Sequence, residues 1–232
     1  MNLFFQPGIP EGIIYLDAEE SRHAVRVLRM TEGDQLDLTD GKGYFYSAKI
    51  TKADSKKCQF EILEKREVKK RNFQIHIAIA PTKNADRNEW FVEKAVEIGI
   101  DEISFIICKN SERKTINMER IEKIAISAMK QSQQAWLPKL NPIIPFKEIT
   151  SGKNDQKFIA YVDATNPVHL QSVAQRDKKY LVLIGPEGDF SKEELDLALQ
   201  NGFQKVSLGH NRLRTETAGI VTCQILNALN SN

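Results

Sequence analysis

The sequence of 232 residues predicts an α/β protein in which a small domain rich in β-strands precedes a larger domain with a mainly parallel sheet. Two observations support this fold class. Up to about residue 72, short apolar runs are separated by turn residues, whereas from Phe73 onward apolar strands alternate with helical patterns. Such alternation is typical of a parallel sheet that helices cover on both faces. We therefore expect two domains, residues 1–71 and 72–232, with the boundary in the charged segment 64–72.

The first domain is predicted to be a small β-barrel that carries one helix. The aromatic, partly alternating run Tyr44–Ile50 has the pattern of a half-buried strand, and the turn residues 40–43 before it are typical of a hairpin. Asp17 stands where it caps a helix whose apolar stripe includes Val25 and Leu28. The expected strands are Gly12–Leu16, Gln35–Thr39, Tyr44–Ile50 and Gln59–Leu63.

The second domain is predicted to contain five strands, each followed by a helix. The spacing of Ser191 and Glu194 is that of a helix capping box, and Asp86 and Glu89 have the same spacing. The expected strands are Phe73–Ala80, Glu102–Cys108, Lys157–Val162, Tyr180–Ile184 and Lys205–Leu208. The expected helices are Arg87–Ile98, Met118–Trp136, a short piece near Val168–Ala174, Lys192–Gln200 and Glu216–Leu229.

The composition excludes several classes of protein. Hydrophobic residues make up 41% of the chain and charged residues 28%, which argues against a disordered chain. Lys and Arg number 33 and Asp and Glu 31, so a nucleic-acid partner has to be inferred from local clusters. The three cysteines and four histidines are scattered, so no metal site is expected. No apolar run approaches ~20 residues and the start lacks a secretory pattern, so we expect a cytoplasmic protein without a membrane partner.

The segment Ile184–Gly188, with the sequence IGPEG, joins an apolar strand to a capped helix. Ligands of open α/β sheets bind beyond the carboxyl ends of strands, and glycines there let the backbone approach a ligand closely. The segment lacks both the G-x-G-x-x-G of a dinucleotide fold and the G-K-[ST] of a phosphate loop. From spacing alone it is either a ligand-binding loop or simply a tight strand-to-helix turn.

A second segment, Leu208–Ala218, follows the next strand and leads into the last helix. Thr215 is a candidate cap of that helix, and Glu216 lies in its first turn, where an acidic residue complements the helix dipole. Arg212 and Arg214 lie where a cation opposes that dipole. They indicate either an ion pair with Glu216 or a contact with an anion or RNA, and the residues alone leave both open.

The chain resembles the SPOUT methyltransferases in three motifs, which are Gly185–Gly188, Leu208-Gly209 and Leu213–Ala218 (LRTETA). More narrowly, it resembles the family that methylates N3 of a uridine, uracil 1498, in 16S ribosomal RNA. Further matches follow in the family's order, so the resemblance covers nearly the whole chain. They are the basic segment 21–30, the segment 83–99, Ser111-Glu112-Arg113, Gln131-Ser132 and Leu137-Pro138. The ordered set is specific, whereas no single motif is.

The resemblance implies a PUA-like β-barrel that binds RNA, followed by a SPOUT α/β domain with a trefoil knot over about residues 158–232. It implies a homodimer that binds S-adenosylmethionine at the loops 163–166, 185–190 and 208–215 and acts on 16S rRNA in the small ribosomal subunit. The residues expected to hold the cofactor are Ile184, Gly185, Pro186, Glu187, Gly188, Leu208, Gly209, Asn211, Leu213, Thr215 and Ala218. Those expected to contact RNA are Arg22, Arg26, Arg29, Lys83, Arg87, Arg113 and Arg212.

Catalytic roles are expected for Arg214 and Glu216. Uracil N3 carries a proton and is a poor nucleophile until that proton leaves, so a cation that stabilises charge on the uracil oxygens would help. We expect Arg214 to act in this way, and Glu216 to orient Arg214 rather than to act as the base. His210 is the rival candidate for the base because of its intrinsic pKa.

The basic segment also has a plainer interpretation. Arg22, Arg26 and Arg29 recur at i, i+4 and i+7, the spacing of one helix face, which is either an RNA contact or simply a solvated basic face.

Five positions depart from the family pattern. Asp189 stands where the family usually has Gly, Asn211-Arg212 where Arg-Ile is usual, Gln134 where a basic residue is common and Val96 where Thr is common. Two alternatives therefore stay open. One is an RNA-binding ribosome-assembly factor of the same fold without methyl transfer, and the other is a SPOUT enzyme with another RNA target.

Overall fold

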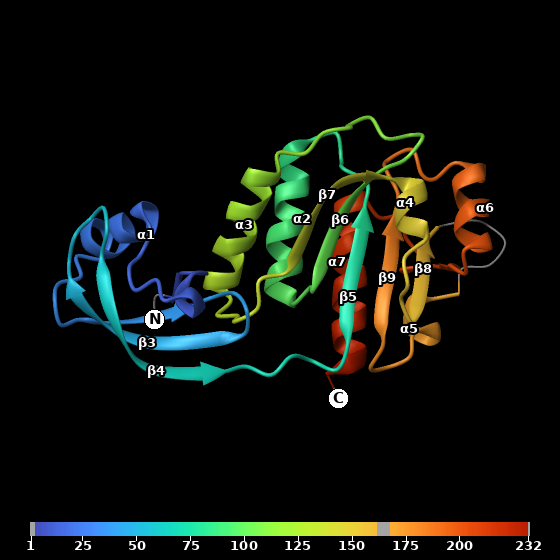
Figure 1. Cartoon of the computed structure of the whole chain (residues 1–232). Coiled ribbons are helices and arrows are strands. Elements are labelled where there is room, and N and C mark those ends of the chain that lie inside the picture. The colour runs from blue at the N-terminus through green and yellow to red at the C-terminus, as the bar shows by residue number, and fades with distance from the viewer. Residues whose placement is uncertain (1–2, 162–167, 232) are drawn as a thin grey trace. The chain divides into compact units, whose positions relative to one another are not determined.

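The computed structural model describes residues 3–161 and 168–231, so the expected cofactor loop 163–166 lies outside the described residues. The chain forms two compact units (Figure 1). The first unit consists of Met1–Lys70 and Ile126–Leu137, and the second of Arg71–Ala125 and Pro138–Asn232. The sequence pattern had assigned the segment 126–137 to the second domain, whereas its contacts place it with the first unit.

The first unit is built around a four-stranded sheet in the order β1-β2-β3-β4 (Figure 1). Its strands are β1 (Leu3–Phe5), β2 (Gln35–Thr39), β3 (Tyr44–Lys52) and β4 (Gln59–Glu67). β1 and β2 run parallel and the other neighbours run antiparallel. Side chains on one face of the sheet, such as Leu36, Leu38, Tyr46 and Ala48, are buried in a hydrophobic core, so the alternating pattern of β3 predicted its orientation correctly.

Two predictions for the first unit were wrong in detail. Gly12–Leu16 is not a strand, because Tyr15 forms only an isolated bridge to Gln59 and the chain turns at Gly12, where φ is 86°. β4 continues to Glu67, into the segment that was expected to be a connector. The reason is that the pairing with β3 persists as far as Tyr44 opposite Glu67.

Asp17 caps α1 (Ala18–Arg22) as predicted, by accepting hydrogen bonds from the N–H groups of Glu19 and Glu20. The helix continues as a π-helix over His23–Val27, so Arg29 lies beyond its end with φ 57°. The i, i+4, i+7 spacing of the three arginines therefore does not define one face of an α-helix, because a π-helix has a wider turn. All three arginine side chains are exposed.

The second unit contains a six-stranded, all-parallel sheet in the order β10-β8-β9-β5-β6-β7. The strands are β5 (Gln74–Ile79), β6 (Glu102–Ile107), β7 (Lys139–Pro145), β8 (Gln156–Ala160), β9 (Lys179–Ile184) and β10 (Gln204–Val206). The mainly parallel sheet predicted from the sequence is thus confirmed, with one strand more than expected. The additional strand, β7, lies at an edge of the sheet, where Pro142 and Pro145 are tolerated because an edge needs fewer N–H donors.

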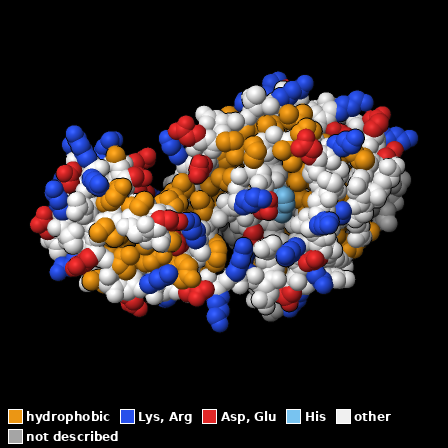
Figure 2. Space-filling model, in the orientation of Figure 1, with side chains coloured by type: hydrophobic (Ala, Val, Ile, Leu, Met, Phe, Trp, Pro, Cys, Tyr) orange, Lys and Arg blue, Asp and Glu red, His pale blue; other side chains and the backbone are white. Residues whose placement is uncertain are grey.

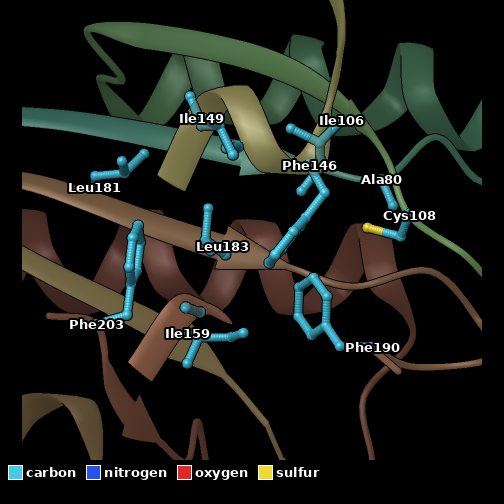
Figure 3. Packing of buried hydrophobic residues seen from close by; sticks show 12 residues of the cluster. Ala80, Ile106, Cys108, Phe146, Ile149, Ile159, Leu181, Leu183, Phe190 and Phe203 are labelled. Atoms are coloured by element: carbon cyan, nitrogen blue, oxygen red, sulfur yellow. The ribbon is translucent and has the colours of Figure 1, made fainter. Parts of the chain in front are cut away.

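Helices cover both faces of this sheet (Figure 1). They are α2 (Ala85–Ile98), α4 (Phe146–Thr150), α5 (Leu170–Val173), α6 (Lys192–Gln200) and α7 (Thr215–Asn230). A further helix, α3 (Met118–Gln131), begins in the second unit and ends in the first. α2 and α7 pack together on one face, where Gly219 of α7 lies against Phe91 and Ile79 so closely that a Cβ would be 2.4 Å from the Phe91 ring. On the other face α4 and α6 cover Ala78, Leu183 and Phe190, with Phe146 packed against Phe190 (Figure 3).

The helix ends differ from several predictions. α2 is capped by Asn84, whose side chain accepts from the N–H of Asp86, so the predicted box at Asp86 is wrong. α3 ends at Gln131 instead of Trp136, because the chain turns at Gln133, which has φ 54°. The capping box at Ser191 and Glu194 is confirmed. α4 was not predicted. Across residues 3–161 and 168–231, no helix is both long enough and apolar enough to cross a membrane.

Candidate functional site

A pocket of about 530 Å³ opens at the carboxyl ends of β8, β9 and β10. This is the edge at which open α/β sheets bind their ligands. Among the described residues, its lining is Ala160, Tyr161, Ile184, Gly185, Pro186, Glu187, Asp189, Val206, Leu208, Gly209, Asn211, Arg212, Leu213, Arg214, Thr215 and Ala218. The two loops singled out in the sequence, after β9 and after β10, therefore form one site.

The loop after β9 is tightly held from both sides. A Cβ on Gly185 would lie 3.1 Å from the ring of Phe190, which is buried in the core below. On the other side, the amide of Asn110 donates hydrogen bonds to the carbonyls of Gly188 (3.1 Å) and Asp189 (3.0 Å). A Cβ on Gly188 would in turn meet Asn110 at 3.1 Å. A side chain at either glycine would thus press on its neighbour, and at Gly185, which lines the pocket, the missing side chain leaves backbone facing the site.

Asp189 adopts a backbone conformation that glycine favours, with φ 61°. Its Oδ1 accepts a hydrogen bond of 2.8 Å from the N–H of Phe190, a local bond of the kind that lets Asp tolerate this region. Burial raises the pKa of the Asp189 carboxyl, opposed by this hydrogen bond and by the nearby charge of Arg212. Asp189 thus occupies a backbone conformation suited to the glycine that is usual in the family, and its own side chain bonds the next N–H.

The start of α7 is joined to the loop after β9. Thr215 was expected to cap α7, but the cap position is Arg214, and Thr215 is the first residue of the helix. The buried Thr215 hydroxyl instead donates a hydrogen bond of 3.0 Å to the carbonyl of Gly185. Before the helix, the Ser207 hydroxyl accepts from the N–H of Gly209 and holds the turn there. The hydrogen bond between Thr215 and Gly185 ties the two walls of the pocket together.

The charged residues around the site do not pair as expected. Glu216 was expected to face Arg214, but its Oε1 lies 3.6 Å from Nε of Arg87 on α2. Glu216 is 7% exposed, and its Oε2 has no hydrogen-bond partner among the described residues. The Arg214 side chain is exposed at the pocket, and its guanidinium forms no ion pair or hydrogen bond within residues 3–161 and 168–231, whereas its backbone carbonyl accepts from the N–H of Ala218. The site thus presents an unpaired cation next to a buried carboxylate that is committed to another helix.

Most of the cofactor residues expected from the sequence come together in this pocket. Gly188 is the exception, since it belongs to the same loop but does not line the pocket. Of the two residues with expected catalytic roles, Arg214 lines the pocket and Glu216 does not. Three residues of the site were not predicted. Tyr161 and Val206 line the pocket at the ends of strands. Asn110 belongs to no sequence motif and meets the loop after β9 only in the folded chain.

The cations expected at RNA are found in different surroundings. The Arg113 guanidinium donates to the carbonyls of Thr82 and Lys83, so it holds the loop that precedes α2. The ammonium of Lys83 pairs with Glu112 at 3.0 Å. Arg212 lines the pocket and is exposed. In the first unit, Arg22, Arg26 and Arg29 have no ion-pair partner among the described residues, so their charges are available to a ligand.

Comparison with known proteins identifies the class to which these units belong. Residues 69–227 match the family model of an RNA methyltransferase domain, and residues 16–63 match that of an RNA methyltransferase PUA domain. Because the first match spans more than half of the chain, the protein belongs to the RNA methyltransferase family. The PUA match agrees with the predicted class of the N-terminal domain.

Particular relatives narrow the class. A protein of Mesomycoplasma hyopneumoniae named ribosomal RNA small subunit methyltransferase E is 31% identical over 76% of this chain and 78% of its own length. A crystal structure described as a probable rRNA-methyltransferase from Porphyromonas gingivalis is 45% identical with a TM-score of 0.94, over 100% of this chain and 99% of that one. The methyltransferase E of Neisseria gonorrhoeae, bound to S-adenosyl methionine, is 25% identical with a TM-score of 0.86, over 99% of this chain and 98% of that one.

Proposed function

We propose that the protein transfers a methyl group from S-adenosylmethionine to N3 of one uridine, uracil 1498, in 16S ribosomal RNA. The observation that carries this proposal is the pocket at the sheet edge, where two loops meet beside an Arg214 whose guanidinium has no partner among the described residues. Its family consists of RNA methyltransferases, and a relative is named for the RNA of the small ribosomal subunit. The choice of uridine N3 rests on the resemblance of the motif Leu213–Ala218.

The pocket fits S-adenosylmethionine. Its volume of about 530 Å³ lies within the ~300–1,000 Å³ of typical small-molecule sites. Gly185 brings backbone to the pocket where a Cβ would lie only 3.1 Å from the Phe190 ring, which suits recognition of adenosine by backbone N–H and C=O groups. A methyl-transferring cofactor of this kind supplies an electrophilic methyl group on a sulfonium. Within residues 3–161 and 168–231, no group of His, Cys, Asp and Glu is arranged to hold a metal.

Arg214 provides the chemistry at the acceptor base. As the N3 proton leaves, negative charge develops on the uracil oxygens, and a guanidinium donor held beside them lowers the energy of that state. Removing one such donor from an oxyanion site costs about 10²–10³ in kcat. Arg214 suits this task because no carboxylate among the described residues competes for its charge, and because the cap position of α7 fixes its backbone.

Glu216 is assigned a positioning role. It does not line the pocket, and its ion pair with Arg87 joins the first turn of α7 to α2. That contact fixes the direction in which α7 begins and therefore the position of its neighbour Arg214. The N3 proton then passes to water at the exposed side of the pocket, and His210, exposed in the loop after β10, is the rival acceptor for that proton.

RNA is proposed to bind through exposed cations on each unit. In the first unit these are Arg22, Arg26 and Arg29, and in the second Arg212, whose charges suit contact with phosphate. Arg87, which is half-buried and pairs with Glu216, is a further proposed contact. From the resemblance we also propose a homodimer, a domain division near residue 71 and a trefoil knot over about residues 158–232. A ribosomal substrate would place the protein in the cytoplasm.

The test is transfer of labelled methyl from S-adenosylmethionine to small ribosomal subunits from cells that lack this gene. We expect the wild-type protein to label these subunits, and Arg214→Ala to lower the rate by about 10²–10³. The same variant should bind the cofactor within about threefold of wild type, because backbone groups hold the adenosine. Methyl transfer by Arg214→Ala at the wild-type rate would overturn the catalytic role proposed for Arg214. Cofactor binding by the wild type without transfer to any ribosomal RNA would favour the assembly-factor alternative.

A further inference from the structure

A second hollow, of about 200 Å³, lies on the face of the four-stranded sheet that is turned away from the core of the first unit. Tyr46, whose side chain belongs to the core, also borders the hollow, and the strand register places most of the other lining residues in two adjacent rows. One row crosses all four strands as Leu3, Asp37, Ser47 and Glu64, and the next contains Phe45 and Arg66. In the view of Figure 2, hydrophobic side chains lie among charged ones over β3 and β4. Partners in register project from the same face of a sheet, so these side chains surround one space.

The walls of the hollow differ in chemistry. The Arg66 guanidinium lies over the Phe45 ring, with Cζ 4.9 Å from the ring centroid. The Ser47 hydroxyl donates to Oδ1 of Asp37 at 3.3 Å, which orients that carboxylate. Glu64 is exposed, and its carboxylate has no partner in the described part of the chain. The hollow thus brings together the Phe45 ring, the Arg66 guanidinium that lies over it and the Glu64 carboxylate, whose two oxygens can accept hydrogen bonds.

A further wall comes from a distant part of the sequence. Gln133, in the turn that follows α3, lines the hollow and adopts φ 54°, which is uncommon for a residue other than glycine. The turn is closed by a hydrogen bond of 3.2 Å from the N–H of Gln133 to the carbonyl of Lys130. An amide side chain is therefore presented to the hollow together with the carboxylates, and it can donate or accept.

We propose that this hollow binds one unpaired guanine of the RNA substrate. The inference rests on the proposed function, because it takes the substrate to be RNA. The Watson–Crick edge of guanine carries two adjacent donors, N1–H and N2–H₂, followed by the acceptor O6. Glu64 accepts from the two donors, and Arg66, two residues further along the same face of β4, donates to O6. Proteins read unstacked RNA bases in this way, by stacking on aromatic rings or Arg planes and by hydrogen bonds to base edges.

The same walls disfavour other occupants. Uracil presents one donor between two acceptors, and adenine and cytosine place an acceptor nitrogen beside their amino group, so each would turn a lone pair toward the Glu64 carboxylate. A cationic protein side chain would lie against Arg66. At about 200 Å³ the hollow is also smaller than the ~300 Å³ at which typical drug-sized sites begin, which suits a single ring system. Lys49, exposed on the same face of β3, offers charge to the flanking phosphate.

The test measures binding of the full-length protein to labelled RNA heptamers by fluorescence anisotropy. The heptamers contain adenosine with a single central guanosine, inosine, cytidine or adenosine, and no uridine, so that no methyl-accepting base is present. Inosine lacks only the N2 amino group. We expect the guanosine heptamer to bind about 5- to 100-fold more tightly than the inosine heptamer, as one bidentate base contact allows. Glu64→Gln should abolish this difference, and the control Glu61→Gln, which changes another exposed carboxylate of β4, should keep it.

Three results would overturn the proposal. They are equal binding of the guanosine and inosine heptamers by wild type, a guanine preference that survives in Glu64→Gln, and cytidine binding as tight as guanosine binding. Methyl transfer to gene-deficient subunits by the same wild-type preparation separates the two claims. Transfer without a guanine preference contradicts only this inference, whereas a guanine preference without transfer contradicts only the proposed function.

Discussion

Replacement of Thr215 by Val removes the hydrogen bond that joins the two walls of the cofactor pocket. Thr215 is 6% exposed, and its hydroxyl donates to the carbonyl of Gly185 over 3.0 Å. Valine keeps the shape of the side chain, so the change removes one donor and leaves the Gly185 carbonyl without this partner. The loss of one partner of a buried hydrogen bond costs about 1–3 kcal/mol. In a chain of this size, that lowers Tm by roughly 2–4 °C per kcal/mol.

The chain offers a matched control two turns further along α7. Thr222 is fully buried, and its hydroxyl has no hydrogen-bond partner among the described residues. Thr222→Val therefore removes a polar group that is already unsatisfied, and we expect the variant to be as stable as wild type or more stable. The two substitutions are chemically identical and differ only in whether a hydrogen bond is lost.

The assays are thermal unfolding and calorimetric titration with S-adenosylmethionine. We expect Thr215→Val to lower Tm and to weaken cofactor binding by about tenfold, which corresponds to 1.4 kcal/mol of lost pocket organisation. Thr222→Val should leave cofactor binding unchanged. Equal stability and equal affinity of the two variants would refute the reasoning that this bond organises the pocket.

Three further predictions follow from single contacts. Asp189→Asn should raise Tm at pH 7, because burial raises the pKa of the carboxyl and makes its ionised form less stable in the folded chain. Below about pH 3.9, where the folded and the unfolded chain both bind the proton, this gain in Tm should vanish, and an equal gain at both pH values would contradict the prediction. Asn110→Ala removes two hydrogen bonds to the loop after β9 and should weaken cofactor binding by about three- to tenfold in the same titration, whereas unchanged affinity would show that the loop holds its shape alone. Arg22→Ala and Arg26→Ala should each reduce the slope of log K against log salt for RNA binding by about 0.7–0.9, and an unchanged slope would exclude a phosphate contact.

The sequence predicted the order of layers in the second unit because its signals are local. The apolar strands, the capping box at Ser191 and Glu194, and the glycine loops after β9 and β10 each depend on neighbouring residues. β7 escaped prediction because its two prolines resemble a loop unless the strand is known to lie at an edge. The assignment of the segment 126–137 to the first unit depends on contacts distant in sequence, such as the bond from the Trp136 indole to the carbonyl of Val68.

The candidate site shows the same division between local and distant information. The loop residues that line the pocket were predicted from motifs, whereas their partners were not. Spacing suggested that Glu216 pairs with Arg214, its neighbour but one, yet the fold brings Arg87 of α2 to within 3.6 Å. Residues that follow each other closely at a helix start point in different directions, so proximity in sequence does not decide which charges meet. Asn110 and Tyr161 reach the site only because parallel strands end at the same edge.

The most direct test of the central claim is to identify the methylated nucleoside. Small subunits from cells that lack this gene are incubated with the protein and S-adenosylmethionine, the 16S rRNA is digested, and the nucleosides are identified and mapped by mass spectrometry. We predict 3-methyluridine at one position, absent when wild-type subunits are the substrate and formed about 10²–10³ times more slowly with Arg214→Ala. A methyl group found on a ribose, on another base or at several unrelated uridines would contradict it.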